Sequence, residues 1–237
     1  MKQRTKLYCN LRGEAITMSG MCFAEFMKYL PAPPERLMVI SGGSGMISAN
    51  SGIERCFEIF NTPELIGELE AENLYACGDF CFVDYADDKF PKRMSEKEIA
   101  ELLYLGRMFR PLNSAFFDTL DNKLAYLSHD DGWYCKIYSR RTADILAAVL
   151  GKIAAYAGMH AKPGSAEFIS ALKHSAERGI IIDMNGLQKT PSGLSVDAYF
   201  AGEFDDMDEV LNKWDSLKGK SDCLRIEYDD GWHIMNA

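Results

Sequence analysis

Apolar residues recur along the chain at two spacings, which predict strands and helices. Runs that alternate, or that are rich in aromatic and β-branched residues, predict strands at 79–85, 124–127, 133–138, 194–200 and 223–228. Spacings of three and four residues predict helices that begin near Ser95, Arg141, Ser165 and Asp206. The N-terminal part predicts a helix that stops before Pro31 and a short strand at 37–40.

Two of the predicted helices begin with the same polar spacing. Ser95 and Glu98 form a capping box, in which the hydroxyl accepts from the Glu98 amide and the carboxylate accepts from the Ser95 amide. Asp206 and Glu209 have the same spacing. The helix that follows them is predicted to bury one stripe, made of Met207, Val210, Leu211 and Trp214.

The string Asp-Asp-Gly-Trp occurs twice, at residues 130–133 and 229–232, each time between strand-like runs. An Asp-Gly pair in this setting predicts a tight hairpin, because the central residues of a type I′ turn adopt positive φ. We therefore expect hairpins over 124–138 and 222–235, with Gly132 and Gly231 at positive φ.

Both hairpins close a run with the order strand, helix, strand, strand, at about residues 77–140 and 190–237. This similarity predicts two related β-α-β-β modules that arose by internal duplication. The first module would hold about 12 extra residues between helix and hairpin, at Arg107–Phe117. The alternative is that two common hairpins arose independently.

The predicted fold class is α+β, with antiparallel sheets packed against helices. We expect an N-terminal α/β segment at 1–76, the first module with a following helix at 77–160, and a helix with the second module at 161–237. These parts can pack as one domain.

Composition favours a folded cytoplasmic protein. With 47% hydrophobic residues, a chain of 237 residues can bury a sizeable core. No run approaches the roughly 18 apolar residues of a membrane helix. The seven cysteines lie scattered in apolar runs, so we expect buried, reduced thiols and no disulfides.

The net charge of −9 is concentrated in two blocks, −8 over residues 59–131 and −7 over 181–237. Nucleic acid is an unsuitable partner for such a surface, because binding to phosphates needs clustered Lys and Arg. A basic protein partner fits the charge better, although acidity can also serve solubility alone.

No catalytic, metal or cofactor motif is complete. The glycine-rich residues 41–45 follow a predicted strand but lack the residues of a phosphate-binding loop. His129-Asp130 has no upstream histidine to complete a metal site, and the acidic residues 205–208 lack the glycine and glutamate of a calcium loop. Pairing of Cys135 with His160 or His174 stays open, because such pairs assemble only in space.

We therefore expect a non-enzymatic protein-binding or regulatory module, of the inhibitor or immunity kind, with an acidic surface and no cofactor or metal. The alternative is a hydrolase with a site between the two modules. The partner-binding residues expected from the sequence are carboxylates and large aromatic anchors, namely Trp133, Phe116, Phe117, Trp232, Asp205 and Asp208.

Overall fold

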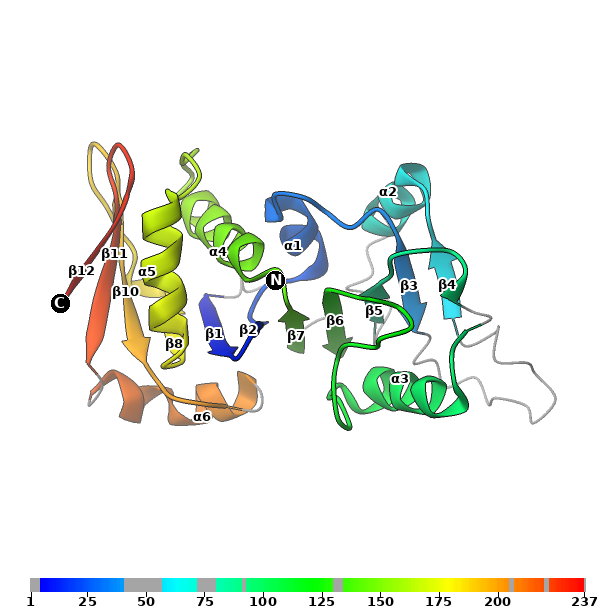
Figure 1. The fold of residues 1–237 in the computed structure, drawn as a ribbon. Helices are drawn as coiled ribbons and strands as arrows, with labels where there is room; N and C mark the ends of the chain where they lie inside the picture. Colours follow the sequence, from blue (N-terminus) through cyan, green and yellow to red (C-terminus); the bar gives the residue numbers. More distant parts are fainter. Residues whose placement is uncertain are drawn as a thin grey trace. The chain divides into compact units, whose positions relative to one another are not determined.

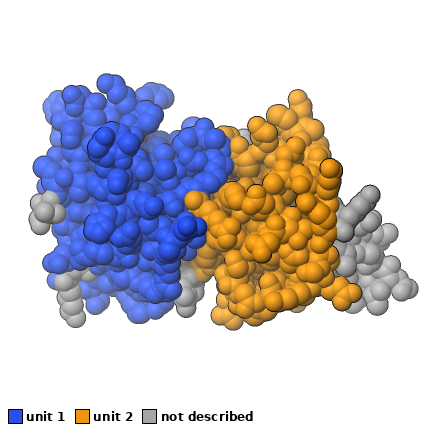
Figure 2. Space-filling model, viewed as in Figure 1, with its two compact units in different colours: residues 1–21, 25–32, 141–237 blue, residues 22–24, 33–140 orange. Residues whose placement is uncertain are grey.

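The computed structural model describes residues 5–40, 57–71, 80–90, 93–129, 134–204, 207–219 and 222–236. The chain divides into two compact units, which share helix α1 (Phe23–Tyr29) (Figures 1 and 2). Unit 1 contains residues 1–21, 25–32 and 141–237, and unit 2 contains residues 22–24 and 33–140. These units do not coincide with the parts expected from the sequence, whose boundaries followed residues 76 and 160.

Unit 1 is built on antiparallel strands in the order β12-β11-β10-β8-β1-β2. Their bounds are β1 Lys6–Arg12, β2 Ala15–Ser19, β8 Ile180–Asp183, β10 Leu194–Phe200, β11 Cys223–Tyr228 and β12 Trp232–Asn236, with the short β9, Gln188–Lys189, beside β10. The helices of this unit are α4 (Thr142–Tyr156), α5 (Ala166–Ala176) and α6 (Met207–Lys218).

Unit 2 is likewise antiparallel, with the strand order β7-β6-β5-β3-β4. Its strands are β3 Leu37–Ile40, β4 Phe57–Phe60, β5 Phe80–Asp84, β6 Leu124–His129 and β7 Tyr134–Ser139. Its helices are α2 (Pro63–Ala71) and α3 (Glu96–Met108). The α+β class with antiparallel sheets, predicted from the sequence, is confirmed.

Local sequence signals set the helix ends. The capping box at Ser95 and Glu98 is present, with both reciprocal hydrogen bonds. The Ser165 hydroxyl caps α5 by accepting from the Phe168 amide, 3.2 Å away. Gly158 and Gly179, which follow α4 and α5, have φ of 69° and 67°, a conformation that terminates helices and favours glycine. The capping residue proposed for α6, Asp206, lies outside the described residues.

Both predicted hairpins form, but the second turn is not the expected one. His129 is paired with Tyr134 across the first hairpin, and Tyr228 is paired with Trp232 across the second. The turn residues 130–133 lie outside the described residues. In the second turn neither Asp229, Asp230 nor Gly231 has positive φ, so the type I′ prediction is wrong there. The Asp229 side chain stabilises this turn instead, because it accepts from the Asp230 amide at 2.6 Å.

The order strand, helix, strand, strand occurs in both units, as predicted: β5-α3-β6-β7 in unit 2 and β10-α6-β11-β12 in unit 1. Between helix and hairpin the first module has residues 109–123, whereas the second has residues 219–222. An extra segment is therefore present in the first module, but it spans residues 109–123 rather than 107–117, because Arg107 and Met108 belong to α3. Common origin of the modules stays a prediction.

No helix within the described ranges combines the length and apolar character that crossing a bilayer requires. No disulfide joins the cysteines of the described ranges, which are Cys9, Cys22, Cys81, Cys135 and Cys223.

Candidate functional site

Helix α6 covers only one end of the sheet of unit 1. It packs Val210 and Trp214 against Tyr8, Ile181 and their neighbours, near the point where β10 ends and β11 begins (Figure 1). Leu211, predicted to join the buried stripe, is 47% exposed instead. The sheet face beyond α6 is therefore left without a helix among the described elements.

Tyr8 fixes the connection from β10 into α6. Its hydroxyl donates to the carbonyl oxygen of Gly202 at 3.0 Å and accepts from the amide of Phe204 at 2.9 Å. Burial raises the pKa of this phenol to about 12, so it stays protonated and can donate at neutral pH. These bonds hold the start of α6 at the end of the sheet.

Beyond α6, the same sheet face carries polar side chains. In β11, Cys223, Arg225 and Glu227 are partly exposed, while the alternate residues are buried. Register places Arg225 between Asp197 and Met235, and Glu227 opposite His233. We call Asp197, Arg225, Glu227, His233 and Met235 the polar face.

Exposure increases across the polar face toward the edge strand β12. The Arg225 guanidinium donates to the Asp197 carboxylate at 2.8 Å, and these side chains are 38% and 31% exposed. The side chain of His233 is 53% exposed, and Met235 is 46% exposed as a residue.

The turn at 229–231 adds negative charge beside the polar face. Asp229 accepts hydrogen bonds from the Asp230 amide and from His233, and these bonds lower its pKa to about 2. Asp229 is therefore ionised at neutral pH. Potential ligand atoms of Asp229, Asp230 and His233 lie within 4.8 Å of one another. All three residues are exposed, and hydrogen bonding within the turn accounts for the arrangement without a metal ion.

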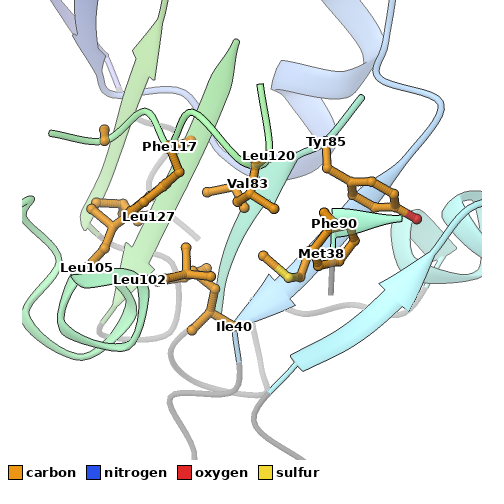
Figure 3. Packing of buried hydrophobic residues seen from close by; sticks show 13 residues of the cluster. Met38, Ile40, Val83, Tyr85, Phe90, Leu102, Leu105, Phe117, Leu120 and Leu127 are labelled. Atoms are coloured by element: carbon orange, nitrogen blue, oxygen red, sulfur yellow. The ribbon is translucent and has the colours of Figure 1, made fainter. Parts of the chain in front are cut away.

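The corresponding face of unit 2 is covered and apolar. There the segment 109–123 places Phe117 and Leu120 over Val83 and Leu127, in a cluster that also includes residues of α3 (Figure 3). Phe117 is 4% exposed and Leu120 is 1% exposed. In unit 1 only residues 219–222 separate α6 from β11.

Buried Asn122 holds the segment 109–123 in shape. Its side-chain amide donates to the carbonyl oxygens of Ala115 and Leu124, and its side-chain oxygen accepts from the Phe117 amide at 2.7 Å. The Asp84 carboxylate also accepts from the Leu124 amide at 2.7 Å. The segment is therefore an integral part of the unit 2 core.

Two of the aromatic anchors expected from the sequence belong to the core. Phe117 is buried under the sheet of unit 2. Trp232 is 6% exposed; its ring lies 6.0 Å from that of Phe168, and its indole donates to the Lys162 carbonyl oxygen. Both are unavailable as surface contacts.

The remaining expected contacts have different outcomes. Phe116 is half-buried, with the Arg140 guanidinium 4.5 Å from its ring centroid. Asp208 lies in α6, and the structure does not describe its side chain. Trp133 and Asp205 lie outside the described residues.

Cys135 and the two histidines considered as its partners differ in burial. Cys135 is 3% exposed, whereas His160 and His174 are exposed. His174 lies 2.9 Å from the Glu177 carboxylate on the surface of α5.

The polar face was not predicted, although the alternation of polar and apolar residues that signals it is present in the sequence. Asp197 and Tyr199 alternate with buried Val196 and Ala198, a pattern typical of a sheet with one face in water. This alternation does not reveal which part of the polar sheet face is covered, because that depends on the length of the connection between helix and hairpin.

No protein-family model matches the sequence, and comparisons with curated proteins and with solved structures give no match.

Proposed function

We propose that this protein is a non-enzymatic binding module that regulates a cationic protein by docking it on the polar face of unit 1. The observation that carries this proposal is the contrast between two similar modules. In unit 2 the sheet face beyond the helix is buried under residues 109–123, whereas in unit 1 it is charged and partly exposed.

Charge favours a basic partner. Asp197, Glu227, Asp229 and Asp230 place four carboxylates on or beside this face, against the guanidinium of Arg225. Since Arg225 is paired with Asp197, the other three carboxylates give the surface its negative character. Such a surface accelerates encounter with a cationic protein and disfavours acidic ones.

Exposed Met235 supplies an apolar contact within this charged surface. Flexible thioether side chains adapt to different partner shapes, and a buried apolar contact slows dissociation. We therefore expect the carboxylates to raise the association rate and Met235 to lower the dissociation rate.

The test compares the full chain with two charge reversals. Glu227→Lys alters the polar face, while the matched control Glu177→Lys makes the same charge change on an exposed residue at the end of α5. Each protein is immobilised and used to capture proteins from native lysate at about 0.05 and 0.3 M salt, a range that spans strong to weak screening.

The proposal expects a basic protein that binds wild type and Glu177→Lys, that is lost with Glu227→Lys, and whose capture weakens at the higher salt. A captured protein that binds all three variants equally, or whose binding is indifferent to salt, contradicts docking on the polar face.

A further inference from the structure

We infer that the cationic partner contributes an extended segment that pairs with β12 and adds a strand to the sheet of unit 1. This inference rests on the proposed function and specifies how the partner binds. Strand addition uses main-chain hydrogen bonds for affinity and alternate side chains for specificity.

The first support is the position of β12. It ends the strand order of unit 1 and pairs with β11 along one edge, in an unbroken register from Tyr228–Trp232 to Leu224–Asn236. Within the described ranges no strand pairs with its other edge. Backbone groups of successive residues point to opposite edges, so alternate residues of β12 present theirs outward.

The second support is that β12 lacks the usual protection of an edge strand. Natural edges are blunted by charged residues, prolines or bulges. The sequence of β12, Trp-His-Ile-Met-Asn, contains no proline, lysine, arginine or carboxylate. Its register with β11 has no bulge. By contrast β4, which ends the strand order of unit 2, carries exposed Glu58.

The surroundings of β12 specify the chemistry of the added strand. On one face an added side chain would lie beside His233 and Met235, close to the carboxylates of Glu227 and Asp229. On the other face it would lie beside Trp232 and Ile234, where the sheet packs on α5. The occupant that fits is therefore a segment in which basic and apolar residues alternate.

A second copy of the chain fits this edge poorly. Each copy carries a net charge of −9, and each would bring its own acidic polar face to the shared sheet. Like charges across an interface oppose association. The charge thus favours a partner of opposite sign.

The experiment measures amide hydrogen exchange by NMR on the full chain with two probe peptides. One is a ten-residue peptide of alternating lysine and valine, and the control replaces each valine by proline, which keeps the charge but removes alternate N–H donors. We expect the Lys-Val peptide to slow exchange of alternate β12 amides at least about tenfold, and the Lys-Pro peptide to leave them unchanged.

Proline substitution within β12 gives an independent check. One of His233→Pro and Ile234→Pro removes a hydrogen bond to β11 and lowers Tm, and the other removes only an outward N–H. The variant that keeps its Tm is expected to lose the protection by the Lys-Val peptide. Protection that persists in that variant overturns strand addition.

The peptide experiment distinguishes failure of strand addition from failure of the proposed docking on the polar face. If both peptides bind equally and Glu227→Lys abolishes both, docking on the polar face stands and strand addition is overturned. If neither peptide binds, strand addition is overturned, and the capture experiment alone decides the function. Concentration-dependent protection of β12 in the protein by itself, with a doubled mass, would assign the edge to a second copy and also overturn the inference.

Discussion

The carboxylate of Glu98 accepts a hydrogen bond from the backbone amide of Thr119 at 3.2 Å, which joins α3 to the segment 109–123. The other carboxylate oxygen accepts from the amide and hydroxyl of Ser95. The Glu98 side chain thus caps α3 and also holds the segment 109–123, which covers the sheet of unit 2, against that helix.

Replacing Glu98 by Gln is expected to destabilise the protein by about 1–2 kcal/mol, because a neutral amide accepts these hydrogen bonds less well. Urea unfolding at pH 7 measures the change. The control is Glu96→Gln, an exposed residue in the first turn of the same helix, for which we expect a loss below about 0.5 kcal/mol. Equal losses for the two variants would contradict the fastening role of Glu98.

The same residue predicts a pH dependence. Burial acts to raise the pKa of Glu98, but hydrogen bonds from Ser95 and Thr119 outweigh it and lower the pKa from 4.5 to about 2. Because the folded pKa is depressed, this stabilisation is complete above about pH 4.5 and is lost as pH falls toward 2. The difference in unfolding free energy between wild type and Glu98→Gln should therefore shrink over that interval. A constant difference would count against this account.

Asn122→Ala is expected to cost about 2–4 kcal/mol. The side chain is fully buried, and its loss leaves the Phe117 amide and the Ala115 carbonyl without their partner. Amide exchange should increase at residues 115–120 before global unfolding. Asn113→Ala is the control, because Asn113 makes its hydrogen bond to Glu101 at the surface and should cost less than about 0.5 kcal/mol. Similar effects of both variants would show that Asn122 does not organise the segment.

Helices and fold class could be predicted from the sequence because their signals are local. Ser95 and Glu98 lie three residues apart, and Gly158 and Gly179 stop the helices before them. The second turn could not be predicted, because its register is set by pairing over the whole of β11 and β12 rather than by Asp-Gly alone.

The candidate site was predicted less well than the fold. Phe117 and Trp232 were identified as large aromatic residues near a loop or a turn, which is also where core aromatics occur. Asp197 and Arg225 are adjacent only through strand pairing over a separation of 28 residues. No local pattern reports such a pairing, nor the extent of α6 along the sheet.

Substitution of Gly179 and of Gly231 should have different effects on stability, because only Gly179 has positive φ. Gly179 has φ of 67°, and a Cβ there would collide with the carbonyl oxygen of Gly202, so Gly179→Ala should cost more than about 2 kcal/mol. Gly231 lacks positive φ, and a Cβ there would meet only the His233 ring, at 4.0 Å. Gly231→Ala should change stability by less than about 0.5 kcal/mol. Melting of both variants tests the turn directly, and a large loss for Gly231→Ala would restore the type I′ assignment.

The pair Lys152 and Glu25 should respond unequally to loss of either partner. The Lys152 ammonium donates to Glu25 at 2.6 Å and to the Gly20 carbonyl oxygen at 3.0 Å, with the Lys152 side chain 4% exposed and that of Glu25 30% exposed. Glu25→Ala leaves a buried cation without its counter-ion and should cost about 3–5 kcal/mol. Lys152→Met replaces that cation by an apolar chain of similar length and leaves no buried charge, so its cost should be at least about 1 kcal/mol smaller. Urea unfolding of the two variants compares these costs at neutral pH. If Lys152→Met is the more damaging change, the ammonium is a net stabiliser of unit 1 rather than a buried charge that depends on Glu25.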